Sequence, residues 1–381
     1  MSFIRRELDL AAALAKKSHF LFGPRQTGKT SLIRETVRAD HTYNLLESDT
    51  LLRLSRDPSL LREQVTQRGA LVVIDEIQKL PALLDEVQWL VDERRCRVLL
   101  TGSSARKLRR GGVNLLGGRL RSRTLHPFVS AELGDAFDLG RALRYGGLPP
   151  IVFSDDPVAD LRAYTGDYLK EEIAHEGLTR NLAAFSRFLE VASLCNTQIL
   201  NMTKIASDAQ VPRTTVHEYF EILKDTLLGW ELPALGLAKK RKALATSKFY
   251  FFDVGVARAL QGRTTLDERS TEYGEAFEAW IFHELRTYLD YRGPGELHYW
   301  RTTSGFEVDF VLDGAIAIEA KATRRATDRE LKGLRAIGDE RRFRRRILVC
   351  TEPHPRRVDD LEVLPVREFL EQLWSGAFAR G

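Results

Sequence analysis

The segment GPRQTGKTS, residues 23–31, constrains the fold of this chain more than any other feature. Its first eight residues fit the pattern G-x-x-x-x-G-K-[ST], which forms a phosphate-binding loop when a strand precedes it and a helix follows it. The surrounding sequence SHFLFGPRQTGKTSLIRETV has this order, because a short apolar stretch enters the loop and a helical pattern leaves it. Alternating apolar strands and helices continue over residues 18–135, which predicts a parallel α/β domain.

The residue types in the loop suit a nucleotide phosphate. Gly23 and Gly28 permit backbone angles that a side chain would forbid, so loop N–H groups can point at phosphate oxygens. We expect Lys29 to reach the terminal phosphates and Thr30 to hold Mg²⁺ through its hydroxyl. The helix that starts near Lys29 directs its positive end toward the anion.

Two acids end the next apolar strand. In LVVIDEIQKLP, residues 71–81, an unbroken apolar run is typical of a strand that is buried on both faces. Asp75 can hold the Mg²⁺ shell, and Glu76 can accept a proton from the attacking water. A protein that only binds nucleotide needs the first acid but not the second, so the pair favours hydrolysis. The predicted ATP-binding residues are Gly23, Pro24, Arg25, Gln26, Thr27, Gly28, Lys29, Thr30, Ser31 and Asp75.

Two further positions are candidates for catalysis. The strand CRVLLTGSS, residues 96–104, ends in Ser103, which could lie between the attacking water and the terminal phosphate or could simply cap a helix. Arg119 follows two glycines in LLGGRL and could reach the phosphates of a neighbouring subunit, or could be a solvated loop residue. The predicted catalytic residues are Glu76, Lys29, Arg119 and Ser103.

These motifs carry a family resemblance. GPRQTGKT, IDEIQKLP, LTGSS, GGRL and HPFVSAEL, in this order, resemble the AAA+-related ATPases of archaeal type, and YGGLPPIV (145–152) and YLKEEI (168–173) also match. The resemblance covers nearly the whole chain. It implies a five-stranded parallel core with a helical lid and a C-terminal domain of unknown function. It also implies a homo-oligomer, and with a finger arginine supplied by a neighbour, a ring of six subunits.

The middle of the chain resembles a DNA-binding module. Residues 138–195 show helical spacing, and the stretch 201–232 predicts a helix, a turn at VP and a second helix, RTTVHEYFEILKDT. Two strands joined by a basic loop follow, so the pattern indicates a winged helix whose wing contacts the phosphate backbone. The alternative is a winged helix used for packing or protein contacts. The predicted DNA contacts are Arg213, Thr214, Thr215, His217, Lys239, Lys240, Arg241 and Lys242.

The C-terminal third predicts a metal site. A helix over residues 273–291 precedes three strands in HYWRTTSGFEVDFVLDGAIAIEAKA, residues 298–322. Asp309 and Glu319 on neighbouring strands could hold Mg²⁺ through oxygen ligands, with Glu278 completing the set, and Lys321 could orient or deprotonate a water. The spacing resembles the PD-(D/E)xK nuclease fold, in which many domains only bind. The alternative is a set of salt-bridged strand acids.

Positive charge accompanies this site. RRFRRR (341–346) and KATRRATDR (321–329) add arginines and lysines that we expect nearby, as a phosphate track or as a solvated face. The formal net charge of the 381-residue chain is +5, which fits a polyanionic partner as well as it fits an ordinary basic protein.

The cysteines, the N-terminus and the lengths of the apolar runs indicate the compartment of the protein. The three cysteines lie far apart without metal-type spacing, which is typical of a reduced compartment. Charges interrupt the apolar residues at the N-terminus, so no secretory signal is expected, and no apolar run approaches the roughly 18 residues of a membrane helix. The sequence therefore predicts a cytoplasmic protein without a membrane partner.

The predicted architecture is α/β with four parts. Residues 1–137 form a parallel-sheet P-loop AAA+ core, 138–195 a helical lid, 196–265 a winged helix and 266–381 an α/β restriction-endonuclease-like domain. With ATP and Mg²⁺ as cofactors, the chain is expected to be a motor or switch that hydrolyses ATP and remodels DNA. The alternatives are an ATP-regulated, metal-dependent DNA nuclease and an ATP-controlled protein-interaction switch that involves no DNA.

Overall fold

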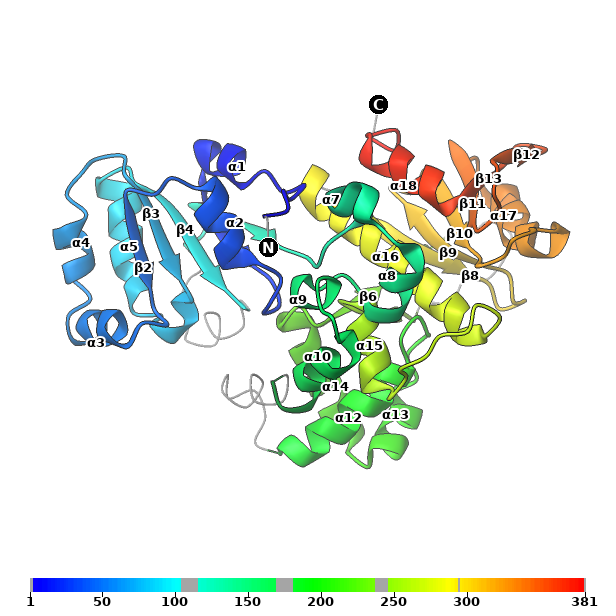
Figure 1. Cartoon of the computed structure of the whole chain (residues 1–381), viewed down its shortest axis with the longest axis horizontal. Coiled ribbons are helices and arrows are strands. Elements are labelled where there is room, and N and C mark those ends of the chain that lie inside the picture. The colour runs from blue at the N-terminus through cyan, green and yellow to red at the C-terminus, as the bar shows by residue number, and fades with distance from the viewer. Residues whose placement is uncertain (1–2, 104–115, 169–180, 237–245, 294, 380–381) are drawn as a thin grey trace. The chain divides into compact units, whose positions relative to one another are not determined.

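The computed structural model describes residues 3–103, 116–168, 181–236, 246–293 and 295–379 (Figure 1). Contacts within the chain divide it into two compact units. One unit comprises Met1–Phe128 with Asp225–Leu227, and the other comprises Val129–Lys224 with Leu228–Gly381.

The first unit is built on a five-stranded sheet in which every pairing is parallel, in the order β2-β3-β4-β1-β5. Its strands are β1 Ser18–Phe22, β2 His41–Asn44, β3 Leu71–Asp75, β4 Arg97–Gly102 and β5 Leu120–Thr124. The parallel α/β core predicted from the alternating pattern is therefore confirmed.

Helices cover both faces of this sheet, which explains why its central strands β1, β3 and β4 are buried along almost their whole length. Helices α1 and α2 lie on one side, and α3, α4 and α5 lie on the other (Figure 1). On the second side, alternate residues of β1, β3 and β4 pack against leucines of α3, α4 and α5. The bounds are α1 Leu10–Lys16, α2 Lys29–Thr36, α3 Ser48–Arg56, α4 Leu60–Gln64 and α5 Leu83–Glu93.

The second unit begins with helices and a hairpin. Its elements are α7 Ser130–Leu133, α8 Leu139–Tyr145, α9 Pro149–Val152, α10 Pro157–Ala163, α12 Leu182–Leu194, α13 Met202–Ala209, α14 Arg213–Asp225 and α15 Val254–Leu260, with the antiparallel strands β6 Gly229–Leu232 and β7 Lys248–Phe251. The two helices and two strands predicted between residues 201 and 252 are thus present.

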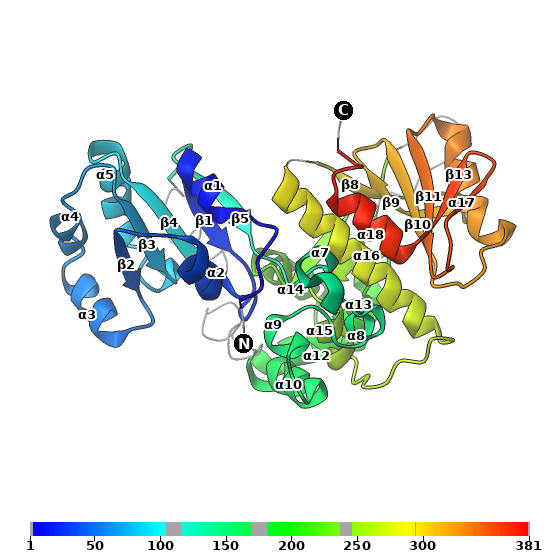
Figure 2. The same cartoon turned by 45° about the horizontal axis from the view of Figure 1, so that its top comes forward.

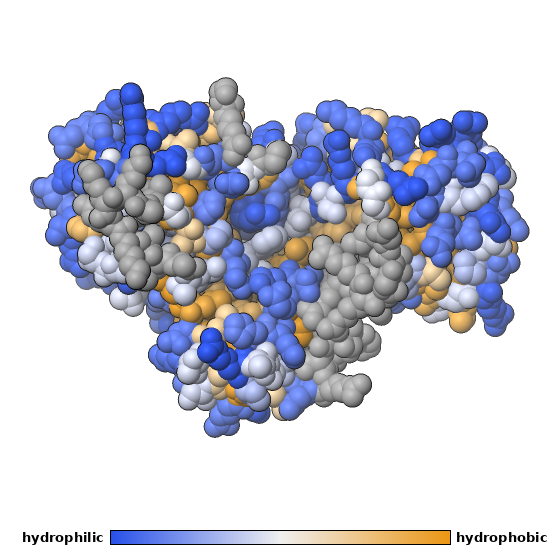
Figure 3. Space-filling model, turned by 180° about the vertical axis from the view of Figure 1, so that it is seen from behind, coloured by the Kyte–Doolittle hydropathy of each residue, from blue (hydrophilic) through white to orange (hydrophobic). Residues whose placement is uncertain are grey.

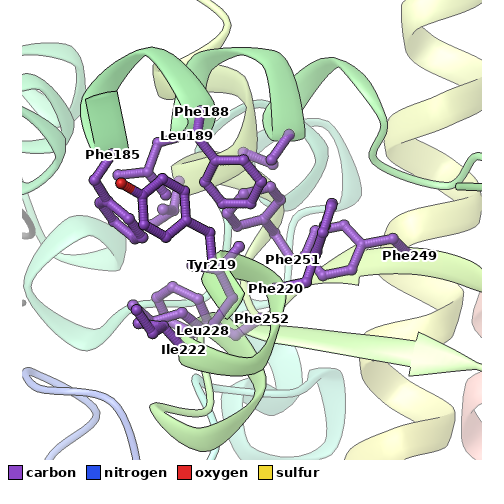
Figure 4. Packing of buried hydrophobic residues seen from close by; sticks show 14 of the residues in the cluster. Phe185, Phe188, Leu189, Tyr219, Phe220, Ile222, Leu228, Phe249, Phe251 and Phe252 are labelled. Carbon is purple, nitrogen blue, oxygen red and sulfur yellow. The ribbon is translucent and has the colours of Figure 1, made fainter. Parts of the chain in front are cut away.

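An aromatic cluster forms the core of this helical part (Figure 4). Phe188 of α12 lies 5.1 Å from Tyr219 and 5.0 Å from Phe220 of α14, measured between ring centroids, and Phe220 lies 4.9 Å from Phe249 of β7. The cluster therefore joins residues assigned to the lid with residues assigned to the winged helix. The four α14 side chains predicted to face inward are buried: Val216, Tyr219, Phe220 and Leu223.

The rest of the second unit is a six-stranded mixed sheet in the order β12-β13-β11-β10-β9-β8. Helix α17 packs on one face, and α16 with α18 covers the other (Figure 2). The three strands predicted within residues 298–322 are confirmed as β8, β9 and β10. The bounds are α16 Thr271–Arg292, β8 Leu297–Arg301, β9 Glu307–Leu312, β10 Ile316–Ala320, α17 Asp328–Glu340, β11 Arg345–Cys350, β12 Arg356–Val358, β13 Leu361–Pro365 and α18 Val366–Trp374.

Backbone hydrogen bonds connect the segment after β6 to the edge strand β8. The Leu235 N–H donates to Tyr299 O at 2.6 Å, and the Tyr299 N–H donates to Pro233 O at 3.0 Å. The segment that follows β6 thereby covers part of the outer edge of β8, which leaves fewer unpaired backbone groups on this edge strand.

Polar side chains cover most of the face of the molecule seen in Figure 3, with small apolar patches between them. Among the described residues, every helix is too short or too polar to cross a membrane.

Glu284 links three helices of the second unit. Its carboxylate is fully buried on α16, where Oε1 accepts from the backbone N–H of Ser130 at 2.8 Å and Oε2 accepts from Trp374 Nε1 at 2.7 Å. Burial raises the pKa of this carboxyl from 4.5 to about 7, although both hydrogen bonds act in the opposite direction.

The raised pKa of Glu284 makes stability depend on pH. Because the folded state holds the proton more tightly, this group stabilises the protein fully below about pH 4.5, and the contribution is lost as pH rises through about 7. We expect the Trp374 indole proton to titrate near pH 7 in NMR spectra of the wild type and not in Glu284→Gln. Exposed Glu371 on α18 provides the control substitution, Glu371→Gln. A Trp374 signal that does not titrate would contradict this assignment.

Candidate functional site

The glycine loop lies between β1 and α2, as the pattern predicts. A Cβ atom on Gly23 would lie 2.5 Å from the carbonyl oxygen of Leu125, so only glycine fits where the loop passes the chain after β5. Gly28 has φ 93° and caps α2, a backbone conformation that favours glycine. The N-terminus of α2 therefore opens onto the loop, where its N–H groups can bind an anion.

Lys29 is folded over the loop. Its side chain is buried, and Nζ donates to Gly23 O at 2.7 Å and to Pro24 O at 3.2 Å. Buried Arg6 supports the same loop from outside it, because Nη1 donates to Thr27 O at 2.8 Å and Nη2 to His126 O. Arg6 was missed in the sequence because no local pattern connects it to a loop 21 residues away.

Thr30 and Asp75 come together at the carboxyl end of the sheet. Thr30 Oγ1 donates to Asp75 Oδ2 at 3.3 Å, and Thr101 Oγ1 donates to Asp75 Oδ1. A hydroxyl and a carboxylate oxygen at one point are ligands that suit Mg²⁺. The residues present therefore fit the ion: Thr30 and Asp75 would hold it beside the terminal phosphates, where it would neutralise charge.

Glu76 and Ser103 are connected through Gln78. Glu76 has φ 60°, an uncommon backbone conformation for a side chain of its kind, and its N–H donates to Thr101 Oγ1 at 3.1 Å. Gln78 Nε2 donates both to Glu76 Oε2 and to Ser103 Oγ, the latter at 3.4 Å. All three side chains are buried. Sequence analysis missed Gln78, although its position two residues after Glu76 at a strand end was a usable signal.

The remaining loop residues lie at the rim of the site. Gln26, Thr30 and Ser31 are exposed, Arg25 is half-buried, and Thr27 is buried with its hydroxyl donating to Pro24 O at 2.8 Å. The structure therefore brings the predicted nucleotide residues together around one loop, with Glu76 and Ser103 at the adjacent strand ends.

Arg119 lies at the other end of the sheet. Strands β1 and β5 pair from Ser18 with Leu120 to Phe22 with Thr124, so Arg119 precedes β5 where β1 begins, whereas the loop follows the end of β1. Arg119 is level with Lys17, so it lies about six residues, or roughly 20 Å of strand, from Gly23 at the start of the loop. Arg119 Nε lies 2.8 and 3.0 Å from the two carboxylate oxygens of Asp92, and this hydrogen bond lowers the pKa of Asp92. Arg119 thus points away from the nucleotide loop of its own chain.

The predicted recognition helix begins at the surface. Arg213, Thr214 and His217 are exposed at the start of α14, and Thr215 is half-buried. The four basic wing residues, Lys239, Lys240, Arg241 and Lys242, lie outside the described residues. The same holds for most of YLKEEI.

The acids predicted to hold a metal do come together in the C-terminal sheet. Asp309 Oδ2 and Glu319 Oε1 lie 3.2 and 2.7 Å from Lys321 Nζ, which confirms that Glu319 and Lys321 share a face. Glu278 of α16 joins them through Lys248 of β7, whose Nζ lies 3.0 Å from Glu278 Oε1 and 3.5 Å from Asp309 Oδ1. Sequence analysis did not place Lys248 in this site.

Opposite charges shift the pKa values in this cluster. Burial alone would lower the pKa of Lys248, but the neighbouring carboxylates hold it well above its usual value, and they raise the pKa of Lys321 in the same way. The two ammonium groups overcome burial at Asp309 and lower its pKa. Burial and the Asp309 charge raise the pKa of Glu319, although the Lys321 ammonium acts in the opposite direction.

The acids predicted to hold Mg²⁺ form ion pairs in this cluster. Within the part of the chain that the structure describes, no group of three or more acids, histidines or cysteines is arranged to hold a metal. Both oxygens of Asp309 and the Oε1 atoms of Glu278 and Glu319 accept from ammonium groups. The alternative of salt-bridged strand acids describes the observed geometry.

Arginines form a groove in a different part of the same sheet. A cavity of about 430 Å³ is lined by Arg341, Arg342, Arg344, Arg345, Arg346 and Arg357, with two acids, Asp360 and Glu362. Arg345 pairs with Ile316 at the start of β10, whereas Glu319 lies near its end. RRFRRR is therefore not beside the acidic cluster, which corrects the expectation drawn from the sequence.

Three family models match successive parts of the chain. Residues 15–134 match a family model described as an AAA domain. This part of the chain is therefore similar to an AAA domain, and its parallel sheet and glycine loop agree with that similarity. Residues 136–267 and 273–369 match two models described only as domains of unknown function, DUF8612 and DUF4143.

A search of curated proteins finds no match. Among solved structures, a structure of the Aeropyrum pernix Orc1 protein in complex with DNA is similar at 14% sequence identity, covering 66% of this chain and 89% of that chain with a TM-score of 0.27. Overlap this weak carries no argument about fold or function, and the DNA belongs to the Orc1 structure alone.

Proposed function

We propose that the chain hydrolyses ATP and uses the cycle as a motor or switch on DNA. The observation that carries the proposal is the contact of Thr30 with Asp75 beside the lysine loop, with Glu76 at the next position of the chain. The phosphate-binding loop, the metal-binding acid and the proton acceptor that a P-loop ATPase needs then all lie at the carboxyl ends of the strands of one sheet.

The residues of the site divide the work. Lys29, now bound to carbonyls of its own loop, would turn to the terminal phosphates, and the N–H groups at the start of α2 would hold the others. Mg²⁺, held by Thr30 and Asp75, would neutralise phosphate charge. Glu76 would accept the proton of the attacking water, and Gln78 would keep Glu76 and Ser103 in position through its amide.

Two surfaces of the second unit support DNA as the partner. The α13–α14 pair and the β6–β7 hairpin have the element order of a winged helix, with polar residues exposed at the start of α14. The arginine groove supplies a second set of phosphate contacts, since six arginines and two acids leave an excess of four positive charges. The proposed winged helix and groove both belong to the unit that lacks the nucleotide site.

The rival functions make different use of the same groups. A nuclease would need the oxygens of Asp309, Glu278 and Glu319, which accept from Lys248 and Lys321. A protein-interaction switch would need the ATP site but not the basic surfaces. DNA binding that weakens with salt therefore separates the proposed function from the switch.

The arginine groove gives a direct test of DNA contact. Arg342 and Arg357 line it and are exposed, so Arg342→Ala with Arg357→Ala removes two phosphate contacts. We expect the slope of log affinity against log salt for duplex DNA to flatten by about 1.8, or about 0.9 for each contact. The slope is measured by fluorescence anisotropy across a salt series.

A matched variant controls for net charge. Arg56→Ala with Arg68→Ala removes two exposed arginines from the first unit and should leave the slope unchanged. Equal slopes for the groove variant and the wild type would show that the groove does not contact DNA. Absence of any salt-dependent binding would favour the protein-interaction switch instead.

A further inference from the structure

The acidic cluster of the C-terminal sheet contains one side chain that comes from outside the predicted nuclease-like segment. Lys248 begins β7, and its side chain is only 4% exposed. Its Nζ lies 3.0 Å from Glu278 Oε1, 2.5 Å from Glu307 Oε1 and 3.5 Å from Asp309 Oδ1. One ammonium group is therefore the shared counter-charge of three carboxylates, one from α16 and two from β9.

We propose that Lys248 is the resident cation of this cluster and that its ammonium closes the cluster to divalent metal ions. A divalent cation such as Mg²⁺ or Mn²⁺ needs several carboxylate oxygens available at one point. The oxygens that converge here are instead directed at an ammonium group, which also repels a second cation. The cluster then holds the hairpin to the C-terminal sheet by charge.

The other bonds of these carboxylates strengthen the argument. Asp309 Oδ2 accepts from the Ala320 N–H at 3.0 Å and from Lys321 Nζ at 3.2 Å. Glu278 Oε1 accepts a hydroxyl hydrogen bond from Tyr250 at 2.7 Å in addition to Lys248. A metal ion could enter only by breaking several of these bonds at once. Each broken bond would leave a buried donor without a partner, which costs free energy.

The position of Lys248 is fixed by its strand. Lys248 pairs with Leu232 in the hairpin, and Tyr250, two residues along on the same face, stacks on Phe282 of α16 with 4.0 Å between ring centroids. The Lys248 ammonium also lies 5.7 Å from the ring centroid of Tyr299 on β8. These contacts distinguish Lys248 from a surface lysine that samples many positions.

The experiment counts metal ions on the nucleotide-free protein by Mn²⁺ electron paramagnetic resonance. All variants carry Asp75→Ala, so that the nucleotide site lacks the carboxylate proposed to hold a metal ion there. We expect no bound Mn²⁺ in this background, and one Mn²⁺ per chain when Lys248→Met is added, because Glu278, Glu307 and Asp309 then lose the ammonium group that they share. The midpoint of thermal unfolding of the Lys248→Met variant should rise on addition of Mn²⁺.

Matched variants make the test specific. Lys224→Met removes another lysine that pairs with two acids, Glu221 at 2.6 Å and Glu231 at 3.1 Å, and should gain no ion. Lys248→Arg keeps the charge and should also gain none. Adding Asp309→Asn to Lys248→Met should remove the gained ion.

Two results would overturn the proposal. The first is a folded Lys248→Met variant that binds no Mn²⁺. The second needs no Lys248 variant and therefore stands even if Lys248→Met fails to fold: the protein with Lys248 intact binds one Mn²⁺ per chain, or nicks plasmid DNA with Mn²⁺, and loses this property on Asp309→Asn. Because the readout is metal binding in the absence of ATP, it is independent of the proposed ATPase cycle.

Discussion

Replacing Glu76 with glutamine is expected to abolish ATP hydrolysis while ATP binding is retained. The substitution keeps the size of the side chain and removes the proton acceptor, whose contribution in enzymes is typically about 10²–10⁴-fold in rate. Lys29, Thr30 and Asp75 are unchanged, so the loop should hold nucleotide as before. Phosphate release is measured in steady state, and binding is measured with a fluorescent ATP analogue.

A second substitution shows whether the effect is specific. Glu93 is an exposed acid at the end of α5, and Glu93→Gln should leave the hydrolysis rate unchanged. If Glu76→Gln hydrolyses ATP at the wild-type rate, a different group must activate the water, and the role assigned to Glu76 is wrong.

Replacing Arg119 with alanine is expected to lower turnover by about 10³–10⁵-fold, the range that finger arginines contribute. Since Arg119 lies at the end of the sheet opposite to its own nucleotide loop, we expect it to act on the nucleotide of another subunit. In that assembly Arg119 would leave Asp92 for the phosphates of its neighbour. We propose that such contacts close into a ring of six subunits. Specific activity should accordingly rise with protein concentration.

Mixing two inactive variants tests whether the arginine acts between subunits. Arg119→Ala has an intact loop, and Lys29→Ala has an intact arginine, so mixed oligomers contain some complete sites and should partly recover activity. Arg97→Ala, which removes an exposed arginine at the same edge of the sheet, is the control and should stay active. Mixtures that form oligomers but remain inactive would show that Arg119 is a surface residue paired with Asp92.

The sequence predicted the features that depend on local order. The loop, its strand and its helix follow one another within 20 residues, so spacing alone locates Lys29 and Thr30. Asp75 could be placed because parallel strands bring their carboxyl ends to one edge. Side chains alternate between the two faces of the sheet along β9 and β10, and this alternation likewise predicts that Asp309, Glu319 and Lys321 lie on one face.

Contacts between distant segments could not be predicted in this way. Lys248 lies 61 residues from Asp309, and no periodicity connects the first residue of a hairpin strand to an acid on another sheet. The Lys248 ammonium is the contact on which we base the proposal that the cluster is closed to divalent metal ions. The prediction that RRFRRR lies near the acids was wrong for a related reason. Its distance from the acids depends on how β11 is paired with β10, and the sequence does not show this register.

The most direct test of the account is the ATP hydrolysis rate of the wild type with and without single-stranded, duplex and branched DNA, with Lys29→Ala as the blank. We expect hydrolysis in the wild type, none above background in Lys29→Ala, and a rate that changes on addition of at least one of the three DNA forms. Hydrolysis that is the same with and without every DNA form would contradict a motor or switch that acts on DNA. Equal rates in the wild type and Lys29→Ala would contradict the ATPase itself.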